Sequence, residues 1–150
     1  MPRRQSFRIR QFLGNNAMQT VANNILFGAA HEELSEGRSV LIRVQGQSML
    51  PFFRSGSTIT LRPIEEGDIR KYNVVMADAE NAFVVHRIIE VSEEYVTLLG
   101  DGNYIGTERV ERDKIYGVVD CSALHIFFAK IWLWLRPVRR FPLAIFRRIL

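Results

Sequence analysis

The sequence predicts a mainly β fold, a mostly antiparallel sheet or partly open barrel with one helix before it and one after it. Six short runs between residues 39 and 119 have the alternation or apolar content of strands, and turns containing Gly, Asp or Asn separate them. Before and after this region, apolar residues recur every three or four positions. At 150 residues, 47% of them hydrophobic, the chain is long enough for one domain with a substantial core.

The first predicted helix covers residues 17–35, and Gly37 follows it as a stop signal. One helix is too little for a helix-turn-helix, so the sequence does not favour DNA binding. The apolar residues at helical spacing are Met18, Val21, Ala22, Ile25, Leu26 and Ala29.

The predicted strands alternate or are apolar throughout. Residues 82–91 are apolar on both faces, which predicts a central position in the sheet. The six runs read SVLIRV, STITLR, NVVMAD, AFVVHRIIEV, YVTLLG and KIYGVV.

After Asp120 the pattern becomes helical again, until Pro137 and Pro142 break it into short pieces. We therefore divide the chain into a basic segment with a helix (1–38), a β domain (39–120) and a basic amphipathic tail (121–150). The apolar positions of the second helix are Leu124, Phe127, Phe128, Ile131, Trp132 and Leu135.

The net charge of +4 conceals an uneven distribution, because all 16 acidic residues lie between residues 32 and 120. Ends that carry only cations suit nucleic acid or an anionic membrane, although the N-terminal end equally suits a solvated tail. No strand or loop surface with interleaved aromatics is evident, so we expect no nucleic-acid partner. The terminal cations are Arg3, Arg4, Arg8, Arg10, Lys130, Arg136, Arg139, Arg140, Arg147 and Arg148.

The C-terminal tail is the candidate membrane-binding segment. Its apolar run, residues 123–135, is interrupted by Lys130 and is shorter than the ~20 residues that a membrane span needs. Aromatics among cations suit the membrane interface instead, which predicts peripheral association through residues 122–150. If this segment packs on the domain or on a partner, we expect a cytoplasmic protein. The aromatics are Phe127, Phe128, Trp132, Trp134, Phe141 and Phe146.

Cysteine and histidine are too few for a disulfide framework or a metal centre. Cys121 is the single cysteine, and none of the three histidines lies at metal-ligand spacing from it. The sequence therefore predicts no metal and no cofactor.

Ser48 lies in the stretch GQSMLP, directly after a predicted strand. Gly46 and Pro51 can hold a sharp turn that presents the serine, with backbone N–H groups nearby for an oxyanion. A serine hydroxyl needs a base within hydrogen-bond reach before it is a nucleophile. The alternative is a plain strand-to-turn junction in which Ser48 bonds its own backbone.

His86 is the candidate base, because it interrupts an apolar strand on the same face as Val84 and Ile88. A histidine at a core-like position needs a polar partner, and a satisfied core histidine is the alternative. Asp101, in LLGDGN, is a third candidate whose alternative role is turn formation.

In order along the chain, GQSMLP, VVHRII, LLGDGN and KIYGVV resemble the sequence boxes of type I signal peptidases and their relatives in the signal-peptidase/LexA superfamily. The resemblance covers residues 40–119 and implies a mostly antiparallel β domain. It implies Ser48 as nucleophile and His86 as general base, in the Ser-His variant found in endoplasmic-reticulum and archaeal signal peptidases. Asp101 would orient His86 or brace the site.

The resemblance also implies that Met49 and Pro51 shape the substrate cleft and that Arg87 is structural. Three positions depart from the family pattern: Gly46 replaces a hydroxyl residue, Gly56-Ser57 replaces Gly-Asp, and GDGN replaces GDN. The last departure leaves Asp113 as a weaker alternative to Asp101. The N-terminal membrane anchor usual in the family is not evident either.

The sequence thus predicts a serine endopeptidase that cleaves leader or signal segments with a Ser48–His86 dyad. The expected partner is a peptide or preprotein, extended beside the cleft strand. Two alternatives remain open: a non-catalytic peptide-binding module on the same scaffold, and a LexA-like self-cleaving regulator.

Overall fold

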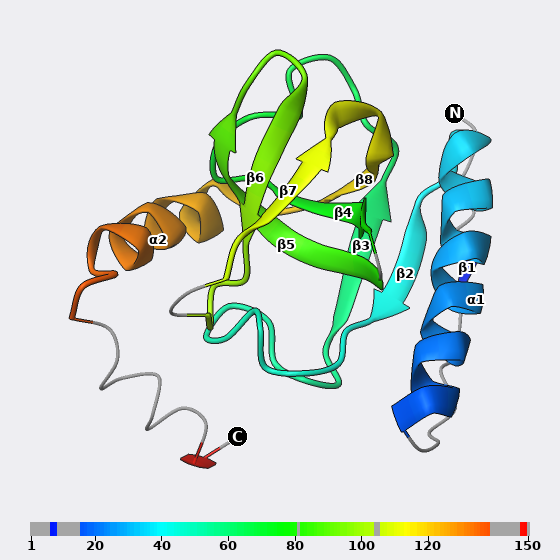
Figure 1. Ribbon diagram of the computed structural model, residues 1–150, viewed down its shortest axis with the longest axis horizontal. Helices are drawn as coiled ribbons and strands as arrows, with labels where there is room; N and C mark the ends of the chain where they lie inside the picture. The colour runs from blue at the N-terminus through cyan, green and yellow to red at the C-terminus, as the bar shows by residue number, and fades with distance from the viewer. Residues whose placement is uncertain (1–6, 9–15, 81, 104–105, 139–147, 150) are drawn as a thin grey trace.

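The computed structural model describes residues 7–8, 16–80, 82–103, 106–138 and 148–149. Within these residues, one sheet of eight strands curls into half a barrel between two helices, α1 and α2 (Figure 1). The strand order is β1-β2-β3-β8-β4-β5-β6-β7, and every pair is antiparallel except β1 with β2. The predicted mainly β, mostly antiparallel fold is confirmed.

All six predicted strands are present, and two further strands were missed. The missed strands are β1 (Phe7–Arg8) and β7 (Glu108–Glu111), which has Val110 as its single apolar residue. A two-residue strand and a charged edge strand carry too little apolar pattern to be detected. The other strands are β2 (Val40–Arg43), β3 (Thr58–Arg62), β4 (Val74–Ala79), β5 (Ala82–Val91), β6 (Tyr95–Leu99) and β8 (Ile115–Val119).

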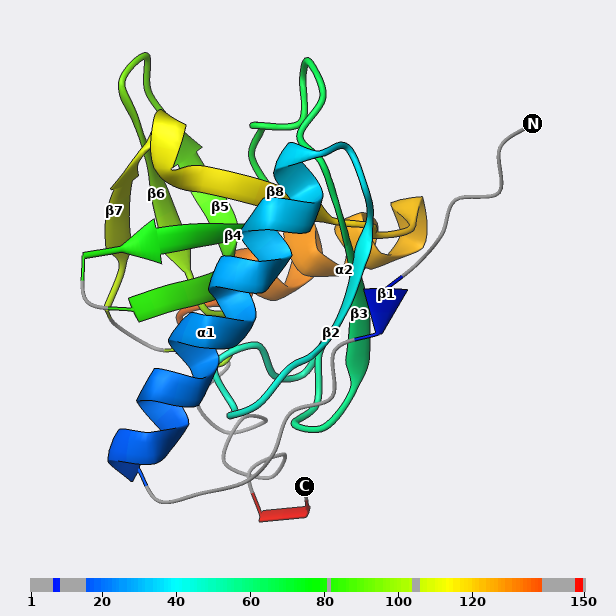
Figure 2. The same ribbon diagram turned by 90° about the vertical axis from the view of Figure 1, so that its right-hand side faces the viewer.

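Helix α1 (Asn16–Ser35) lies obliquely across β2, β4 and β8 (Figure 2). It buries Leu26, Ala30 and Leu34, which are spaced by four residues. Ile25 is 69% exposed, so the predicted apolar row includes a residue outside the core. Leu34 can pack closely on the sheet because the residue of β8 beneath it is Gly117. A Cβ on Gly117 would lie 2.8 Å from Leu34 Cδ1.

The helix ends as predicted. Gly37 has a φ of +80°, and its N–H donates to the Leu34 carbonyl at 3.0 Å.

Strand β4 separates two hydrophobic cores. Val74 and Met76 pack towards α1, β2 and β3, whereas Val75 and Ala77 pack towards β5, β6 and β8. All four side chains are fully buried. Strand β4 therefore has apolar residues buried on both faces.

Strand β5 pairs with β4 on one side and β6 on the other, as its predicted central position requires. Its pairing with β6 begins only at Arg87. Among the described residues, the 82–86 half of β5 has a strand partner on one side alone, and residues 83–85 are only partly buried. This half strand borders the pocket that contains the candidate site.

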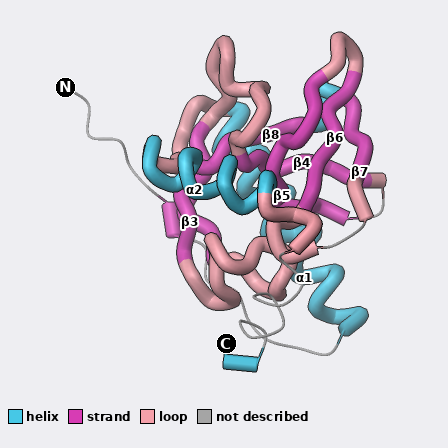
Figure 3. Tube along the Cα trace, turned by 90° about the vertical axis from the view of Figure 1, so that its left-hand side faces the viewer, coloured by secondary structure: helices cyan, strands magenta, loops and turns pink. Residues whose placement is uncertain are grey.

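Helix α2 (Ala123–Trp134) packs on the side of the sheet away from α1 (Figures 1 and 3). Ser122 begins it, with its hydroxyl accepting from the His125 N–H at 3.2 Å. Across the described part of the chain, neither helix combines the length and the apolar character that crossing a bilayer demands. The 3-10 helix η1 (Arg112–Lys114) joins β7 to β8.

Candidate active site

The Ser48 turn lies against the turn formed by residues 100–103. Gly102 N–H donates to the Ser48 carbonyl at 2.7 Å. A Cβ on Gly102 would lie 2.4 Å from the Gln47 carbonyl oxygen, and one on Gly100 would lie 2.5 Å from that of Ser48. The two glycines of GDGN are therefore needed because the backbone of Gln47 and Ser48 passes directly over them.

The Ser48 hydroxyl differs from the other turn serines. Ser57 Oγ donates to the Arg54 carbonyl at 2.7 Å, and Ser35 Oγ donates to the Glu32 carbonyl at 2.7 Å. Within the described ranges, the Ser48 hydroxyl makes no hydrogen bond to another protein group. It therefore does not hold its own turn, which is the alternative role for this residue.

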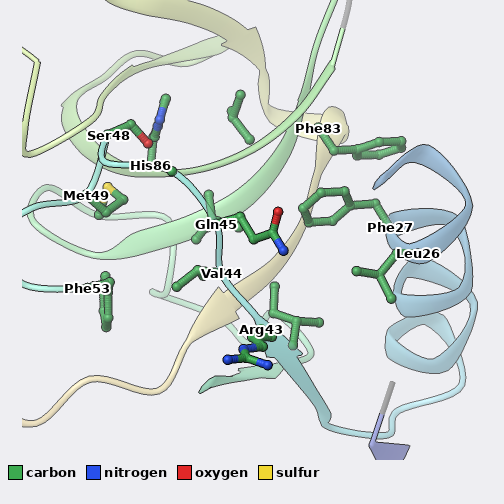
Figure 4. A pocket seen from close by; sticks show the side chains of 14 residues that line it. Leu26, Phe27, Arg43, Val44, Gln45, Ser48, Met49, Phe53, Phe83 and His86 are labelled. Carbon is green, nitrogen blue, oxygen red and sulfur yellow. The ribbon is translucent and has the colours of Figure 1, made fainter. Parts of the chain in front are cut away.

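Ser48 and His86 line the same pocket, of about 160 Å³. Figure 4 shows them together at one end, with Phe27 and Phe83 at the other, where the two rings stack at 5.4 Å. The lining is mostly apolar: Leu26, Phe27, Ile42, Val44, Met49, Phe53, Phe83, Val84 and Val85.

His86 is buried, and a carboxylate orients its ring. Its Nδ1 lies 2.9 Å from Glu108 Oε2 of β7. A carboxylate can only accept a hydrogen bond, so Nδ1 carries the proton and Nε2 is the acceptor nitrogen. This tautomer is the one that a general base for Ser48 requires.

Asp101 contacts Arg87 rather than His86. Its two carboxylate oxygens accept from Arg87 Nε at 2.7 Å and from Nη2 at 2.6 Å, and both residues are fully buried. This bidentate pair lies behind the Ser48 turn and braces it. Asp113, the weaker alternative, is exposed in η1.

Helix α2 supports the same brace from outside. Trp132 Nε1–H donates to the Asp101 carbonyl at 2.8 Å. His125 Nε2 lies 3.1 Å from Arg87 Nη2, and its ring packs on Phe52 and Phe53, just after the Ser48 turn. Burial, and then the Arg87 charge, lower the pKa of His125 to about 4, so the ring is neutral at pH 7 and accepts from Arg87.

The remaining predicted site residues lie close to the serine. Met49 is buried and lines the pocket, whereas Pro51 is partly buried and does not. Gly46 has a φ of +88°, a conformation that favours glycine and so explains its presence in place of a hydroxyl residue.

Within the part of the chain that the structure describes, neither a metal site nor a reactive thiol accompanies Ser48. The described ranges contain no cluster of three potential metal ligands. Burial raises the pKa of the Cys121 thiol to about 11, so this thiol is protonated at neutral pH and is a weak nucleophile.

An unbonded serine beside an oriented histidine, on a curled antiparallel sheet, defines a domain of the serine-peptidase class. Residues 14–120 match the model of the peptidase S24-like family, and the chain belongs to this family. Membership implies a serine peptidase kind of activity, or the related self-cleaving fold. No curated protein matches the chain significantly.

Glu108 is the site residue that the sequence analysis did not find. It lies 22 positions after His86 on the charged strand β7. The only available signal was the need of a buried histidine for a polar partner. That requirement does not distinguish Glu108 from the other carboxylates of the β domain.

Proposed function

We propose that the protein is a serine endopeptidase of signal-peptidase type, which cleaves leader or signal segments with Ser48 as nucleophile and His86 as general base. One observation carries the proposal: the unbonded Ser48 hydroxyl shares a pocket with a histidine whose Nδ1 proton is held by Glu108. Glu108 acts as the positioning residue for His86, and Asp101 braces the Ser48 turn through Arg87.

In the proposed mechanism, His86 Nε2 takes the proton from Ser48 Oγ as that oxygen attacks the scissile carbonyl carbon. The tetrahedral intermediate collapses, and the leaving amine takes the proton from Nε2. Water, deprotonated by the same nitrogen, then hydrolyses the acyl-enzyme and restores Ser48. Glu108 stabilises the imidazolium that forms in each half-reaction.

Two backbone groups are candidates for the oxyanion hole. Among the described residues, the N–H groups of Ser48 and Met49 have no acceptor within the protein. Donors left unsatisfied beside a nucleophile suit the negative oxygen of a tetrahedral intermediate. In this proposal they replace a side-chain hydroxyl that many members of the family use to bind the oxyanion. This chain has Gly46 at the position of that hydroxyl residue.

The substrate binds as an extended strand in this proposal. The pocket lies between residues 42–49 and residues 83–86 of β5, and that half of β5 has a described strand partner on one side only. A peptide here can add to the sheet through its backbone and place alternate side chains in the apolar pocket. An apolar pocket favours hydrophobic segments such as leaders, and the family resemblance implies small residues next to the cut.

The test compares new protein N-termini in cells that make the wild type, Ser48→Ala or Ser57→Ala. Ser57 lies after the same turn but outside the pocket, and its hydroxyl bonds Arg54, so Ser57→Ala is a matched control for loss of a serine. We expect new N-termini with the wild type and Ser57→Ala and none with Ser48→Ala. N-termini that do not depend on Ser48 would instead indicate a non-catalytic peptide-binding module.

Self-cleavage is the second candidate, favoured by the family match to residues 14–120. It predicts that the purified wild type converts to two fragments at a rate independent of protein concentration, while Ser48→Ala stays intact. A wild-type chain that keeps its full mass while it cleaves other polypeptides rules this candidate out.

A further inference from the structure

The outer face of α2 is apolar, although it is exposed. Its exposed side chains recur every three or four residues and so form one face of the helix. Phe127 and Phe128 are each 56% exposed, and Trp134 is 78% exposed. We call this set the outer face: Leu124, Phe127, Phe128, Ile131, Trp134 and Val138, which continues it beyond the helix end.

The face of α2 that docks on the domain is the more polar one. It contacts the domain through the His125 ring, the Trp132 N–H and the fully buried Ala129. These contacts fix the orientation of the helix, so the outer face cannot turn inward without breaking the hydrogen bonds to Arg87 and Asp101. In a water-soluble surface helix the pattern is normally the reverse.

A cationic hollow of about 370 Å³ adjoins the outer face. Lys71, Lys130 and Arg136 line it together with Trp134, and none of its lining residues is acidic. Tyr72 also lines it, and two of the cations lie over its ring, with Lys130 Nζ 5.2 Å and Lys71 Nζ 5.3 Å from the ring centroid.

The position of Tyr72 is fixed by the fold. Its φ is +80°, which is unfavourable for a residue other than glycine. Arg87 Nη1 donates to its carbonyl at 2.7 Å, and its own N–H donates to Ile88 at 2.8 Å. The hollow is therefore preformed, and the brace behind Ser48 holds it.

We propose that the outer face of α2 inserts into the surface of an anionic phospholipid bilayer, with the Lys71–Lys130–Arg136 hollow receiving lipid phosphate groups. Exposed aromatics next to cations are the combination that partitions into a bilayer interface. The absence of acidic residues from position 121 onward removes the repulsion that anionic headgroups would otherwise exert. Binding holds the protein on the membrane through the helix that buttresses the Ser48 turn, and it does not depend on catalysis.

The experiment is flotation of the full chain carrying Ser48→Ala, with vesicles of phosphatidylglycerol mixed with phosphatidylcholine or of phosphatidylcholine alone. We expect flotation with the anionic vesicles only. Phe127→Ser combined with Phe128→Ser should weaken binding on the order of 100-fold or more. Ile25→Ser, which removes an exposed apolar residue from α1, should leave binding unchanged.

The charge contribution is tested separately. Lys71→Gln combined with Lys130→Gln should weaken binding about 30-fold, ~1 kcal/mol for each lysine. Lys114→Gln, on the 3-10 helix outside this face, is the control. Brominated lipids should quench the tryptophan fluorescence of the wild type. Most of this quenching should be lost in Trp134→Phe, because the remaining Trp132 is held against Asp101.

Three results would overturn the proposal. One is equal flotation of the wild type and the Phe127/Phe128 variant, or no flotation of either. A second is equal binding to neutral and anionic vesicles. A third is a lipid-free dimer that the same two substitutions dissociate, which would assign the face to a second copy of the chain.

Discussion

His86 and Arg87 are neighbours on β5 whose side chains serve opposite purposes. Each has a carboxylate partner: His86 Nδ1 contacts Glu108 at 2.9 Å, and Arg87 binds Asp101 at 2.6 and 2.7 Å. Both members of the Arg87–Asp101 pair are fully buried, whereas the Glu108 side chain is 30% exposed and His86 lines the pocket. Strand alternation puts one pair at the pocket and the other behind it.

The difference shows what burial does to a pair formed by a basic side chain and a carboxylate. Any conformation that separates a fully buried ion pair leaves a charge buried without a partner, which is strongly unfavourable. Such a pair therefore fixes the relative positions of the segments that carry it. A pair at a pocket keeps access to solvent and substrate, so it suits a part in the reaction. The Arg87 side is therefore expected to govern folding and the His86 side to govern reaction rate.

The largest expected effect is on stability and comes from Asp101→Ala. This substitution leaves the Arg87 charge buried without its partner, which costs about 3–5 kcal/mol of unfolding free energy. Urea denaturation measures it. Glu108→Ala is the matched control and should cost less than about 1 kcal/mol because Glu108 is partly exposed. The double substitution of Arg87 with Met and Asp101 with Leu should recover most of the lost unfolding free energy. Equal urea midpoints for Asp101→Ala and the wild type would contradict the structural role of this pair.

The next effect is on rate and comes from Glu108→Gln. The amide can present an N–H to Nδ1 and so favour the wrong tautomer, which should lower kcat/KM about ten-fold to a thousand-fold. Peptide cleavage over a pH series measures it, with the urea midpoint as a check that folding is unchanged. Glu111→Gln, an exposed residue of the same strand, should have no effect. A Glu108→Gln enzyme with wild-type kcat/KM at every pH would remove Glu108 from the mechanism.

A smaller effect, on both properties, comes from Gly102→Ala. The added methyl group would lie 2.4 Å from the Gln47 carbonyl oxygen, so the Ser48 turn must shift, at about 1–3 kcal/mol. Activity and the thermal midpoint should fall together. Gly28→Ala is the control: its Cβ meets nothing within 4 Å inside α1, and it should raise stability by about 0.5–1 kcal/mol. Unchanged activity in Gly102→Ala would mean that the two turns do not depend on each other.

The smallest effect at neutral pH is that of His125 on the Arg87 side, because it develops only in acid. The folded protein holds the pKa of His125 at about 4, below its ordinary 6.5, mainly by burial. Between these values the unfolded chain binds a proton that the folded protein does not, so unfolding free energy falls as pH drops from 6.5 to 4 and is unaffected above that range. His125→Gln should lose less stability over this interval in urea titrations. Parallel pH curves for the two proteins would contradict the burial of a neutral ring.

Much of the fold was predictable because its signals are local. Alternation identified six strands, helical spacing identified α1 and α2, and Gly37 marked the end of α1. β7 was not predictable, since ERVE has one apolar residue and is a strand only because β6 offers it an edge. Ile25 shares the apolar spacing of α1, yet it is exposed. The side of the helix that carries Leu34 faces the sheet instead, because Gly117 leaves space for that side chain. Phe141 and Phe146 lie outside the described residues, so their part in membrane binding stays a prediction.

By itself the sequence determined a mainly β domain with two helices, a serine in a sharp turn and a histidine in an apolar strand. These features depend on backbone preference and on periodicity, which neighbouring residues set. The tertiary structure alone decided which carboxylate pairs with which basic side chain: Glu108 of β7 contacts His86 of β5, and Asp101 pairs with Arg87. It also decided that α2 docks through His125, Ala129 and Trp132 and leaves its apolar outer face exposed. Pairings between distant strands depend on register and curl, and no local pattern encodes them.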